Sequence, residues 1–212
     1  MPTNLSRIKA GLLGAVILAG GSSSRLSDKC FKTLAHKELI VHVFERLSEV
    51  TDEIVVAVKS SEHASHVARL LPAAVIVRDE VRDQTPLVGF LSGLRAIKTQ
   101  YVFVAPCDAP FIQPEVIRFL FQRALGNDGA IAITTGQRLE PLCAIYDRDR
   151  AIVAAEQSVE HRYMSMLGML EKLDTLVRVP VEEVRKVDPQ FLTFRNINTA
   201  EDLAWAEQAI QK

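Results

Sequence analysis

The chain has 212 residues, 48% of them hydrophobic and 24% charged, which is typical of a globular protein with a substantial core and excludes a disordered chain. Its 25 basic and 26 acidic residues nearly cancel, so there is no overall positive field to attract nucleic acid or an anionic membrane surface. The longest apolar stretches have the length of strands and fall short of the roughly 18 residues that indicate a membrane span. We therefore expect neither nucleic acid nor a membrane as a partner.

Short apolar runs alternate along the chain with longer helical patterns. In chain order, strands are predicted at 15–19, 54–58, 74–79, 101–108, 129–135 and 141–146, and helices at 39–48, 66–71, 87–97, 114–125 and 199–210. This alternation indicates an α/β fold with a mostly parallel Rossmann-like sheet and helices on both faces. Residues 156–192 are less regular, and no linker or repeat divides the chain. We expect a single domain over residues 1–212, in which residues 1–12 form a short N-terminal extension.

The cysteines and the N-terminal segment bear on the compartment. Cys30, Cys107 and Cys143 are scattered, odd in number and without CxxC spacing, which fits reduced thiols that act as small apolar residues in a cytoplasmic protein. Arg7 and Lys9 precede an apolar run, as in a signal peptide, but that run contains glycines and leads into a polar loop rather than a cleavage site. We expect a cytoplasmic protein without a signal peptide.

The first predicted strand ends in a glycine-rich and basic loop. Ligands of parallel α/β sheets bind beyond the carboxyl ends of the strands. Gly20-Gly21 lacks Cβ atoms, so backbone N–H groups can approach an anion, and the serines 22–24 add hydroxyl donors. Arg25 and either Lys29 or Lys32 supply positive charge for phosphate oxygens. The segment matches neither GxxxxGK[ST] nor GxGxxG, so it indicates a polyphosphate site of another class, or alternatively a solvated turn with surface charge.

The strand predicted at 101–108 places a carboxylate at the same edge of the sheet. Asp108 ends this strand and is followed by an Ala-Pro turn. Such a carboxylate suits a hard cation such as Mg²⁺ if a nucleotide supplies the other ligands. The alternative is a structural Asp that caps the following helix or stabilises the turn.

Together these segments resemble the molybdenum cofactor guanylyltransferases of the nucleotidyltransferase superfamily. LAGGSSSRLSDK (18–29) is similar to that family's LAGGxSxRMGxDK signature. Further similar segments follow in the family's order: KELIVHV (37–43), TPLVGFLSGL (85–94), VAPCDAPFI (104–112), EPLCAIY (140–146) and FRNINTAEDL (194–203). The resemblance spans nearly the whole chain and implies the nucleotide-diphospho-sugar transferase type of fold.

The resemblance also implies a reaction and a set of site residues. The reaction is the transfer of GMP from GTP to molybdopterin with Mg²⁺, which yields the guanine dinucleotide cofactor and pyrophosphate. Transient contacts with other cofactor-biosynthesis proteins or with acceptor molybdoenzymes are then expected. The implied nucleotide-binding residues are Leu18, Ala19, Gly20, Gly21, Ser23, Arg25, Lys29, Asp79 and Asp108. Among them Arg25, Lys29 and Asp108 are the implied catalytic residues, and Asp108 is the implied metal ligand. Asn196 and Asn198 are implied to lie on the acceptor side, although polar turn residues before the helix at 199–210 are an equal alternative.

This chain departs from the family pattern in the loop after the first strand, at His36 and Thr85, and at Glu38, which replaces a proline. Leu26-Ser27 shortens the phosphate loop by one residue, which leaves Lys32 as a rival of Lys29. His36 and Thr85 stand where the pattern has glycine, and each such loss restricts φ. Other functions therefore stay open: cytidylyl transfer to molybdopterin, nucleotidyl transfer to a sugar phosphate or another phosphorylated acceptor, or a nucleotide-binding module without turnover.

Two residue clusters are assigned structural roles. His63 and His66 are spaced by one helical turn without a third metal ligand, so we expect surface residues rather than a metal site. Met164, Met166 and Met169 form a stripe on one helical flank, which is typical of core packing.

Overall fold

The computed structural model describes residues 11–20, 29–79, 85–134, 136, 138–161 and 164–210. Its strands are β1 Leu13–Ala19, β2 Thr33–Leu34, β3 Lys37–Glu38, β4 Ile54–Val58, β5 Val75–Arg78, β6 Tyr101–Pro106, β7 Gly129–Ile133, β8 Leu139–Asp147 and β9 Leu176–Pro180. Its α-helices are α1 Leu39–Ser48, α2 Ser61–Leu70, α3 Pro86–Ala96, α4 Pro114–Ala124, α5 Arg148–Glu160, α6 Met166–Leu170, α7 Val181–Val184 and α8 Ala200–Ile210. Two short 3₁₀ turns, η1 Lys29–Phe31 and η2 Leu192–Phe194, complete the described elements.

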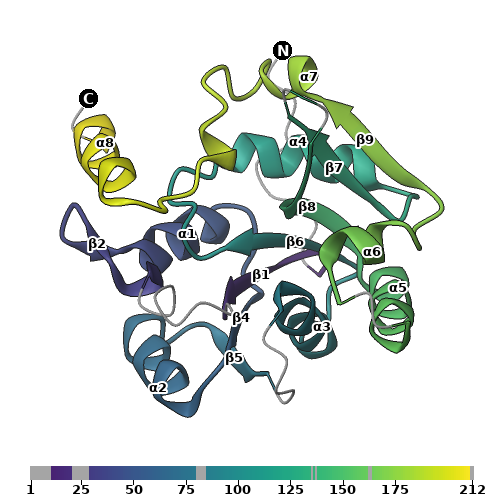
Figure 1. Ribbon diagram of the computed structural model, residues 1–212, viewed down its shortest axis with the longest axis horizontal. Helices are drawn as coiled ribbons and strands as arrows, with labels where there is room; N and C mark the ends of the chain where they lie inside the picture. Colours follow the sequence, from purple (N-terminus) through teal and green to yellow (C-terminus); the bar gives the residue numbers. More distant parts are fainter. Residues whose placement is uncertain are drawn as a thin grey trace.

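A seven-stranded sheet in the order β5-β4-β1-β6-β8-β7-β9 forms the centre of the molecule (Figure 1). The neighbours β5, β4, β1 and β6 are parallel, and β9 is parallel to β7. Within this sheet β8 is antiparallel to both of its neighbours, β6 and β7. The predicted α/β class with a mostly parallel sheet is confirmed, and the carboxyl ends of β1, β4, β5 and β6 meet at one edge.

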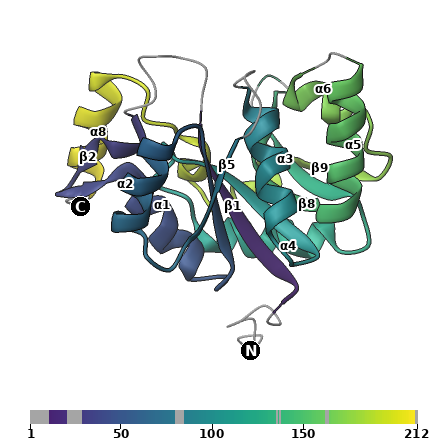
Figure 2. The ribbon, with the colours of Figure 1, turned by 90° about the horizontal axis from the view of Figure 1, so that it is seen from below.

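Helices cover both faces of this sheet because successive side chains of each strand point to opposite faces. On β1, Ala15 and Ile17 pack in a cluster with α1, α2 and α4, whereas Val16 and Leu18 pack in a second cluster with α3, α5 and α6. Figure 2 shows α1 and α2 on one side of the sheet and α3, α5 and α6 on the other. A third, smaller cluster around Ile197 joins α8 to the β2–β3 hairpin.

Most predicted helices begin where the sequence supplies a start signal. Pro86 and Pro114 occupy the first turns of α3 and α4, where a missing N–H costs no helical hydrogen bond. Helix α2 begins earlier than the predicted residue 66, because the Ser60 side chain caps it by accepting from the His63 N–H. In the less regular region 156–192 the structure contains the end of α5, then α6, β9 and α7.

The prediction of three reduced thiols is wrong for two of them. Cys30 and Cys107 form a disulfide, with their Cα atoms 5.3 Å apart, and Cys143 is a free buried thiol. The cause is topology: Cys107 follows β6, Cys30 follows the loop after β1, and these strands are neighbours in the sheet. A bond across 77 residues therefore closes at one edge of the sheet.

The loop departures noted in the sequence have different consequences. Ala35 and His36 form the turn between β2 and β3 with φ of +47° and +67°, so His36 adopts the left-handed conformation in which glycine is strain-free. Thr85 has φ of −101°, an extended conformation that needs no glycine. The changed residues between Gly21 and Asp28 lie outside the described residues.

His63 and His66 are half-buried, and both rings pack against Phe31. The ring centroid of Phe31 lies 5.4 Å from that of His63 and 4.2 Å from that of His66. Of the methionine stripe, Met166 and Met169 are buried core residues, as expected. None of the described helices is long and apolar enough to cross a membrane.

Candidate functional site

A cavity of about 240 Å³, here called the β1–β6 cavity, opens beyond the carboxyl ends of β1 and β6. Seven residues that the sequence assigned to the site line it: Leu18, Ala19, Gly20, Lys29, Asp108, Asn196 and Asn198. They come from segments far apart in the chain, which the parallel strands bring to one edge. Of the other predicted residues, Asp79 is not part of this lining, and Gly21, Ser23 and Arg25 lie outside the described residues.

Lys29 provides the positive charge in the described wall of this cavity. It begins the turn η1, and its backbone carbonyl accepts a hydrogen bond from the Lys32 N–H at 3.0 Å. Its ammonium Nζ donates to the Oδ1 of Asn198 at 2.8 Å. Lys32, the rival lysine, is absent from the cavity lining, so the geometry favours Lys29 as the cavity lysine despite the shortened loop.

Asp108 follows the end of β6 and also lines the cavity. The Cys107 N–H donates to the Leu18 carbonyl at 3.2 Å, which continues the β1–β6 pairing up to the cavity. The Asp108 carbonyl accepts from the Ile197 N–H at 2.8 Å, which ties the segment before α8 to the same place. Burial raises the pKa of the Asp108 carboxyl, while the charge of Lys29 and a backbone hydrogen bond act in the opposite direction. The carboxylate is thus short of solvation and suited to a cationic partner.

The Cys30–Cys107 disulfide lies in the wall between these two charged residues. Cys30 is the next residue after Lys29, and Cys107 is the residue before Asp108. Both cysteines line the cavity, with exposed fractions of only 2% and 9%. The covalent bond therefore fixes the backbone that carries Lys29 relative to the backbone that carries Asp108.

Asp79 follows β5 and reaches toward the first glycine of the loop after β1. A Cβ on Gly20 would lie 3.2 Å from its Oδ2, and a Cβ on Gly89 of α3 would lie 3.4 Å from the same atom. Burial raises the pKa of Asp79 from 3.8 to about 6, although a hydrogen bond with Ser92 opposes the shift. Its Oδ1 is buried and has no hydrogen-bond partner among the described residues. A buried carboxylate oxygen of this kind is free to accept from a ligand.

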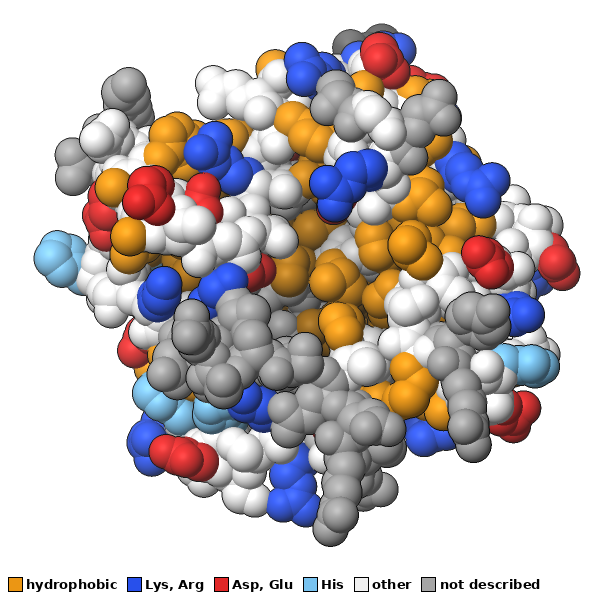
Figure 3. Space-filling view, viewed as in Figure 1, with side chains coloured by type: hydrophobic (Ala, Val, Ile, Leu, Met, Phe, Trp, Pro, Cys, Tyr) orange, Lys and Arg blue, Asp and Glu red, His pale blue; other side chains and the backbone are white. Residues whose placement is uncertain are grey.

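A second cavity of about 490 Å³, the β8 cavity, shares Pro106, Leu142 and Asn196 with the first. The rest of its wall comes from Arg138–Cys143 on and before β8, from Leu167 of α6 and from Phe194. Figure 3 shows hydrophobic side chains gathered in the hollow at the middle of this face, with basic side chains at its border. The two cavities together could hold two ligands with their ends in contact at the shared residues.

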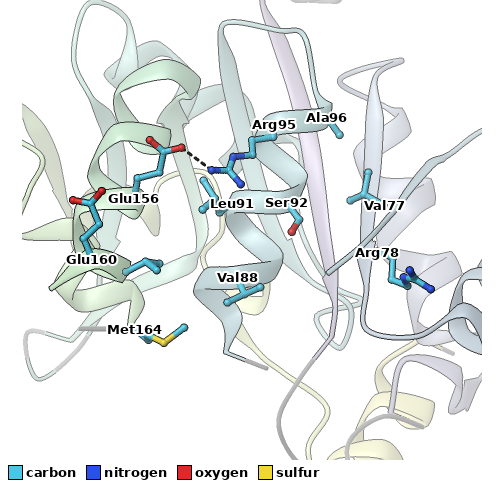
Figure 4. Close-up of a pocket in the computed structure, with 11 residues that line it drawn as sticks. Val77, Arg78, Val88, Leu91, Ser92, Arg95, Ala96, Glu156, Glu160 and Met164 are labelled. Carbon is cyan, nitrogen blue, oxygen red and sulfur yellow. Dashed lines mark hydrogen bonds and ion pairs between the residues drawn. The ribbon is translucent and has the colours of Figure 1, made fainter. Parts of the chain in front are cut away.

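A larger cavity of about 640 Å³ lies between α3 and α5 (Figure 4). Arg95 and Glu156 form an ion pair of 2.7 Å across it, and both side chains are exposed. None of the residues that line this cavity is one of the predicted site residues. Its connection to the predicted site is Ser92, whose side chain hydrogen-bonds to Asp79. Size alone therefore does not mark the candidate site, whereas the convergence of strand ends and opposite charges does.

The residues around Asp108 bear on the expected metal. The described residues contain no group of three or more His, Cys, Asp or Glu side chains that could enclose a cation. A single carboxylate at a cavity fits Mg²⁺ held jointly by the protein and by phosphate oxygens, which is the usual arrangement for this ion. The donor set is thus compatible with a metal that arrives with a nucleotide.

Sequence reasoning missed three features of the site. The disulfide could have been inferred, because each cysteine adjoins a residue that the motifs already placed in the cavity. The bond from Lys29 to Asn198 joins residues 169 positions apart and left no local signal. The hydrogen bond between Ser92 and Asp79 likewise depends on how α3 packs beside β5.

Comparisons with known proteins extend over the same segments. The family model of the MobA-like NTP transferase domain matches residues 15–175. A molybdenum cofactor guanylyltransferase of Syntrophotalea carbinolica is 34% identical over 92% of this chain and 90% of that protein. Another from Desulfosudis oleivorans is 30% identical over 92% of this chain and 95% of that protein. The crystal structure of molybdopterin-guanine dinucleotide biosynthesis protein A from Archaeoglobus fulgidus has a TM-score of 0.77 and 28% identity, over 93% of this chain and 98% of that one.

Proposed function

Because the chain belongs to the MobA-like NTP transferase family, we propose that it is a molybdenum cofactor guanylyltransferase, which transfers GMP from GTP to molybdopterin. The observation that carries the proposal is the convergence of Lys29 and Asp108 on the β1–β6 cavity, beside the shared border with the β8 cavity. A site of this kind has a cation for phosphate charge, a carboxylate for a metal, and room for an acceptor next to the nucleotide.

The proposed reaction is an in-line substitution at phosphorus. A terminal phosphate oxygen of molybdopterin forms a bond to the α-phosphorus of GTP, and the bond from that phosphorus to the oxygen that bridges to the β-phosphate breaks. The electron pair leaves with pyrophosphate. A phosphate nucleophile is already ionised near neutral pH, so the reaction needs positioning and charge neutralisation rather than a general base.

Each wall of the β1–β6 cavity has a role in this reaction. The backbone at Gly20 borders the triphosphate, and the ammonium of Lys29 stabilises the charge that builds on pyrophosphate. Arg25, outside the described residues, is proposed to share that role. Asp108 would hold Mg²⁺, which supplies positive charge to the phosphate oxygens when bound.

Asp79 is the residue that we expect to select guanine. Guanine presents two adjacent N–H donors on one edge, and a carboxylate can accept from both. The Oδ1 of Asp79 is buried without a partner among the described residues, which favours a donor from the ligand. Cytosine and adenine present an acceptor next to the amino donor on that edge, so they pair less well with a carboxylate.

The β8 cavity is proposed to hold molybdopterin. It adjoins the β1–β6 cavity at Asn196, so the terminal phosphate of an acceptor there would meet the α-phosphate of the nucleotide. We propose the cytoplasm as the compartment, because GTP is supplied there, and transient contact with acceptor molybdoenzymes for release of the product. In the cytoplasm the Cys30–Cys107 disulfide would exchange with cellular thiols. Whether the two cysteines are oxidised or reduced can be measured on the isolated protein.

The test combines nucleotide binding with product analysis. With Mg²⁺, GTP should raise the melting temperature more than CTP, ATP or UTP, since a ligand of the native state stabilises it by mass action. With molybdopterin added, pyrophosphate and a guanine dinucleotide should appear together in equal amounts. A larger shift and product with CTP would favour cytidylyl transfer. If GTP binds but releases no pyrophosphate with either molybdopterin or a sugar phosphate as acceptor, the protein is a nucleotide-binding module.

A further inference from the structure

The contact between Lys29 and Asn198 joins the beginning of the site to the end of the chain. The Lys29 Nζ donates to the Asn198 Oδ1 at 2.8 Å, across a separation of 169 residues. Both side chains line the β1–β6 cavity. Asn198 therefore contacts the group that the reaction uses for leaving-group charge, whereas the family resemblance implied a place on the acceptor side.

The backbone of Asn198 is itself held from both sides. Its N–H donates to the Oδ2 of Asp202 at 3.0 Å, and the same oxygen accepts from the Thr199 N–H at 2.9 Å. The Thr199 hydroxyl accepts in return from the Asp202 N–H, which completes a capping box at the start of α8. On the other side, Ile197 is fully buried and donates its N–H to the Asp108 carbonyl. Asn198 thus projects from a turn that is anchored to Asp108.

An amide oxygen is well matched to the task of holding a lysine. Lysine has a long flexible stem, and fixing it costs side-chain entropy that a preorganised contact reduces in advance. The ammonium has three N–H donors, and one bond to a neutral amide leaves two donors and the full charge for phosphate oxygens. A carboxylate at the same place would hold the ammonium but cancel its charge.

Asn196 provides a contrast within the same segment. It lines both the β1–β6 cavity and the β8 cavity, and no hydrogen bond of its side chain is recorded among the described residues. Asn196 is therefore placed to meet the acceptor, whereas Asn198 is engaged with Lys29.

We propose that Asn198 is a positioning residue that holds the ammonium of Lys29 toward the leaving pyrophosphate. The inference rests on the proposed GMP transfer and changes the side of the reaction on which Asn198 acts. If Asn198 acts through Lys29, its loss has no further consequence once the Lys29 side chain is removed.

A double-mutant cycle tests the inference. Wild type, Asn198→Ala, Lys29→Ala and the double variant are compared for pyrophosphate release at saturating GTP and Mg²⁺, with Asn196→Ala as the matched control. We expect Asn198→Ala to lower kcat about tenfold and to change the KM for molybdopterin less than about twofold. In the Lys29→Ala background the same change should cost less than about twofold. Asn196→Ala should instead raise the KM for molybdopterin, equally in both backgrounds.

Binding of inorganic pyrophosphate gives a second readout that needs no turnover. In calorimetry with Mg²⁺, Asn198→Ala should weaken pyrophosphate binding severalfold, and should have no effect when Lys29 is already alanine. If wild type releases no pyrophosphate from GTP, the proposed function fails, and this titration still decides the role of Asn198. Because the Asn198 side chain is exposed, Asn198→Ala should have the same melting temperature as wild type. If its melting temperature is lower, Asn198→Ser is used in place of Asn198→Ala. The inference would be overturned if Asn198→Ala lowered kcat or pyrophosphate affinity as much in the Lys29→Ala background as in wild type. It would also be overturned if Asn198→Ala changed only the KM for molybdopterin.

Discussion

The β1–β6 cavity and the β8 cavity share Pro106, Leu142 and Asn196, but their walls are held in different ways. The first lies beyond the carboxyl ends of the parallel strands β1 and β6, and its wall is held by a disulfide and by the bond from Lys29 to Asn198. The second, twice as large, lies beside the antiparallel strand β8, and most of its wall is a continuous strand segment with Leu167 of α6. The braced cavity therefore suits the proposed chemistry, which depends on exact charge placement, and the wider cavity suits the proposed acceptor.

The largest effect should come from the carboxylate of the braced cavity. Asp108→Asn removes the charge that would hold Mg²⁺, so pyrophosphate release should fall by at least about a hundredfold. Because burial raises the pKa of Asp108, a neutral amide is well accommodated, and the melting temperature should stay the same or rise. Asp149→Asn on α5, where the side chain is 77% exposed, is the matched control and should leave both quantities unchanged. Near-normal turnover of folded Asp108→Asn would place the metal elsewhere.

The disulfide should have the next largest effect, on stability. A bond that closes 77 residues stabilises the fold by roughly 4 kcal/mol in the chain-entropy model, which corresponds to about 10 °C in a chain of this size. Protein isolated without reductant should therefore show one free thiol when denatured and should melt about 10 °C lower after reduction. The Cys30→Ser variant should have the melting temperature of the reduced protein, and adding reductant should not change it.

Hydrogen exchange can show which of the two cavities the disulfide stabilises. After reduction, amides of residues 29–31 and 104–108 should exchange faster, while those of β9 should not change, because the bond braces only the first cavity. Cys143→Ala is the control, since this thiol is buried and its pKa is raised by burial. Three titratable thiols in the protein before reduction would show that Cys30 and Cys107 are not bonded in solution.

The same contrast explains what the sequence could predict. The ends of β1 and β6 were predictable to within two residues, because their continuous apolar runs stop shortly before Gly20 and Asp108. Strand β9 was not, because it is an edge strand in which Arg178 and Pro180 interrupt the apolar pattern. Helix α5 buries a face of alanines, which is a weak signal. The bond from Lys29 to Asn198 depends on packing between the chain ends, which no local pattern encodes.

A smaller effect concerns the pH dependence of guanine recognition. Burial raises the pKa of Asp79 to about 6, so the ionised carboxylate is disfavoured in the folded protein. The free energy of unfolding therefore falls as the pH rises from about 4 to about 6, where Asp79 loses its proton. Asp79→Asn should therefore melt higher than wild type above pH 6. If the carboxylate accepts from guanine, the ratio of GTP to ATP affinity should fall by up to about tenfold between pH 7 and pH 5.

Using that ratio isolates Asp79 from other titrations. ATP and GTP carry the same phosphates, so protonation of the triphosphate or of Asp108 affects both nucleotides alike. In Asp79→Asn the ratio should be low and independent of pH. A ratio that stays constant in wild type across this range would remove Asp79 from base selection and assign it to the packing of Gly20 and Gly89.

The smallest effect should come from the turn that follows the cavity lysine. His36 has φ of +67° in the two-residue turn between β2 and β3, and a residue with a Cβ pays about 1 kcal/mol or more for this conformation. Glycine avoids that strain but loses more entropy on folding, so His36→Gly should stabilise the protein by about 0.5 to 1 kcal/mol, measured by urea unfolding. Thr33→Gly, at an exposed position within β2, gains no relief of this kind and should destabilise the protein.

The turn is also held by the Ala35 N–H, which donates to Glu207 of α8 at 3.0 Å. The turn should therefore keep its conformation in His36→Gly, and pyrophosphate release should be unchanged. Loss of activity in a more stable His36→Gly would mean that the strained turn helps to place Lys29, and that the braced cavity extends as far as this hairpin.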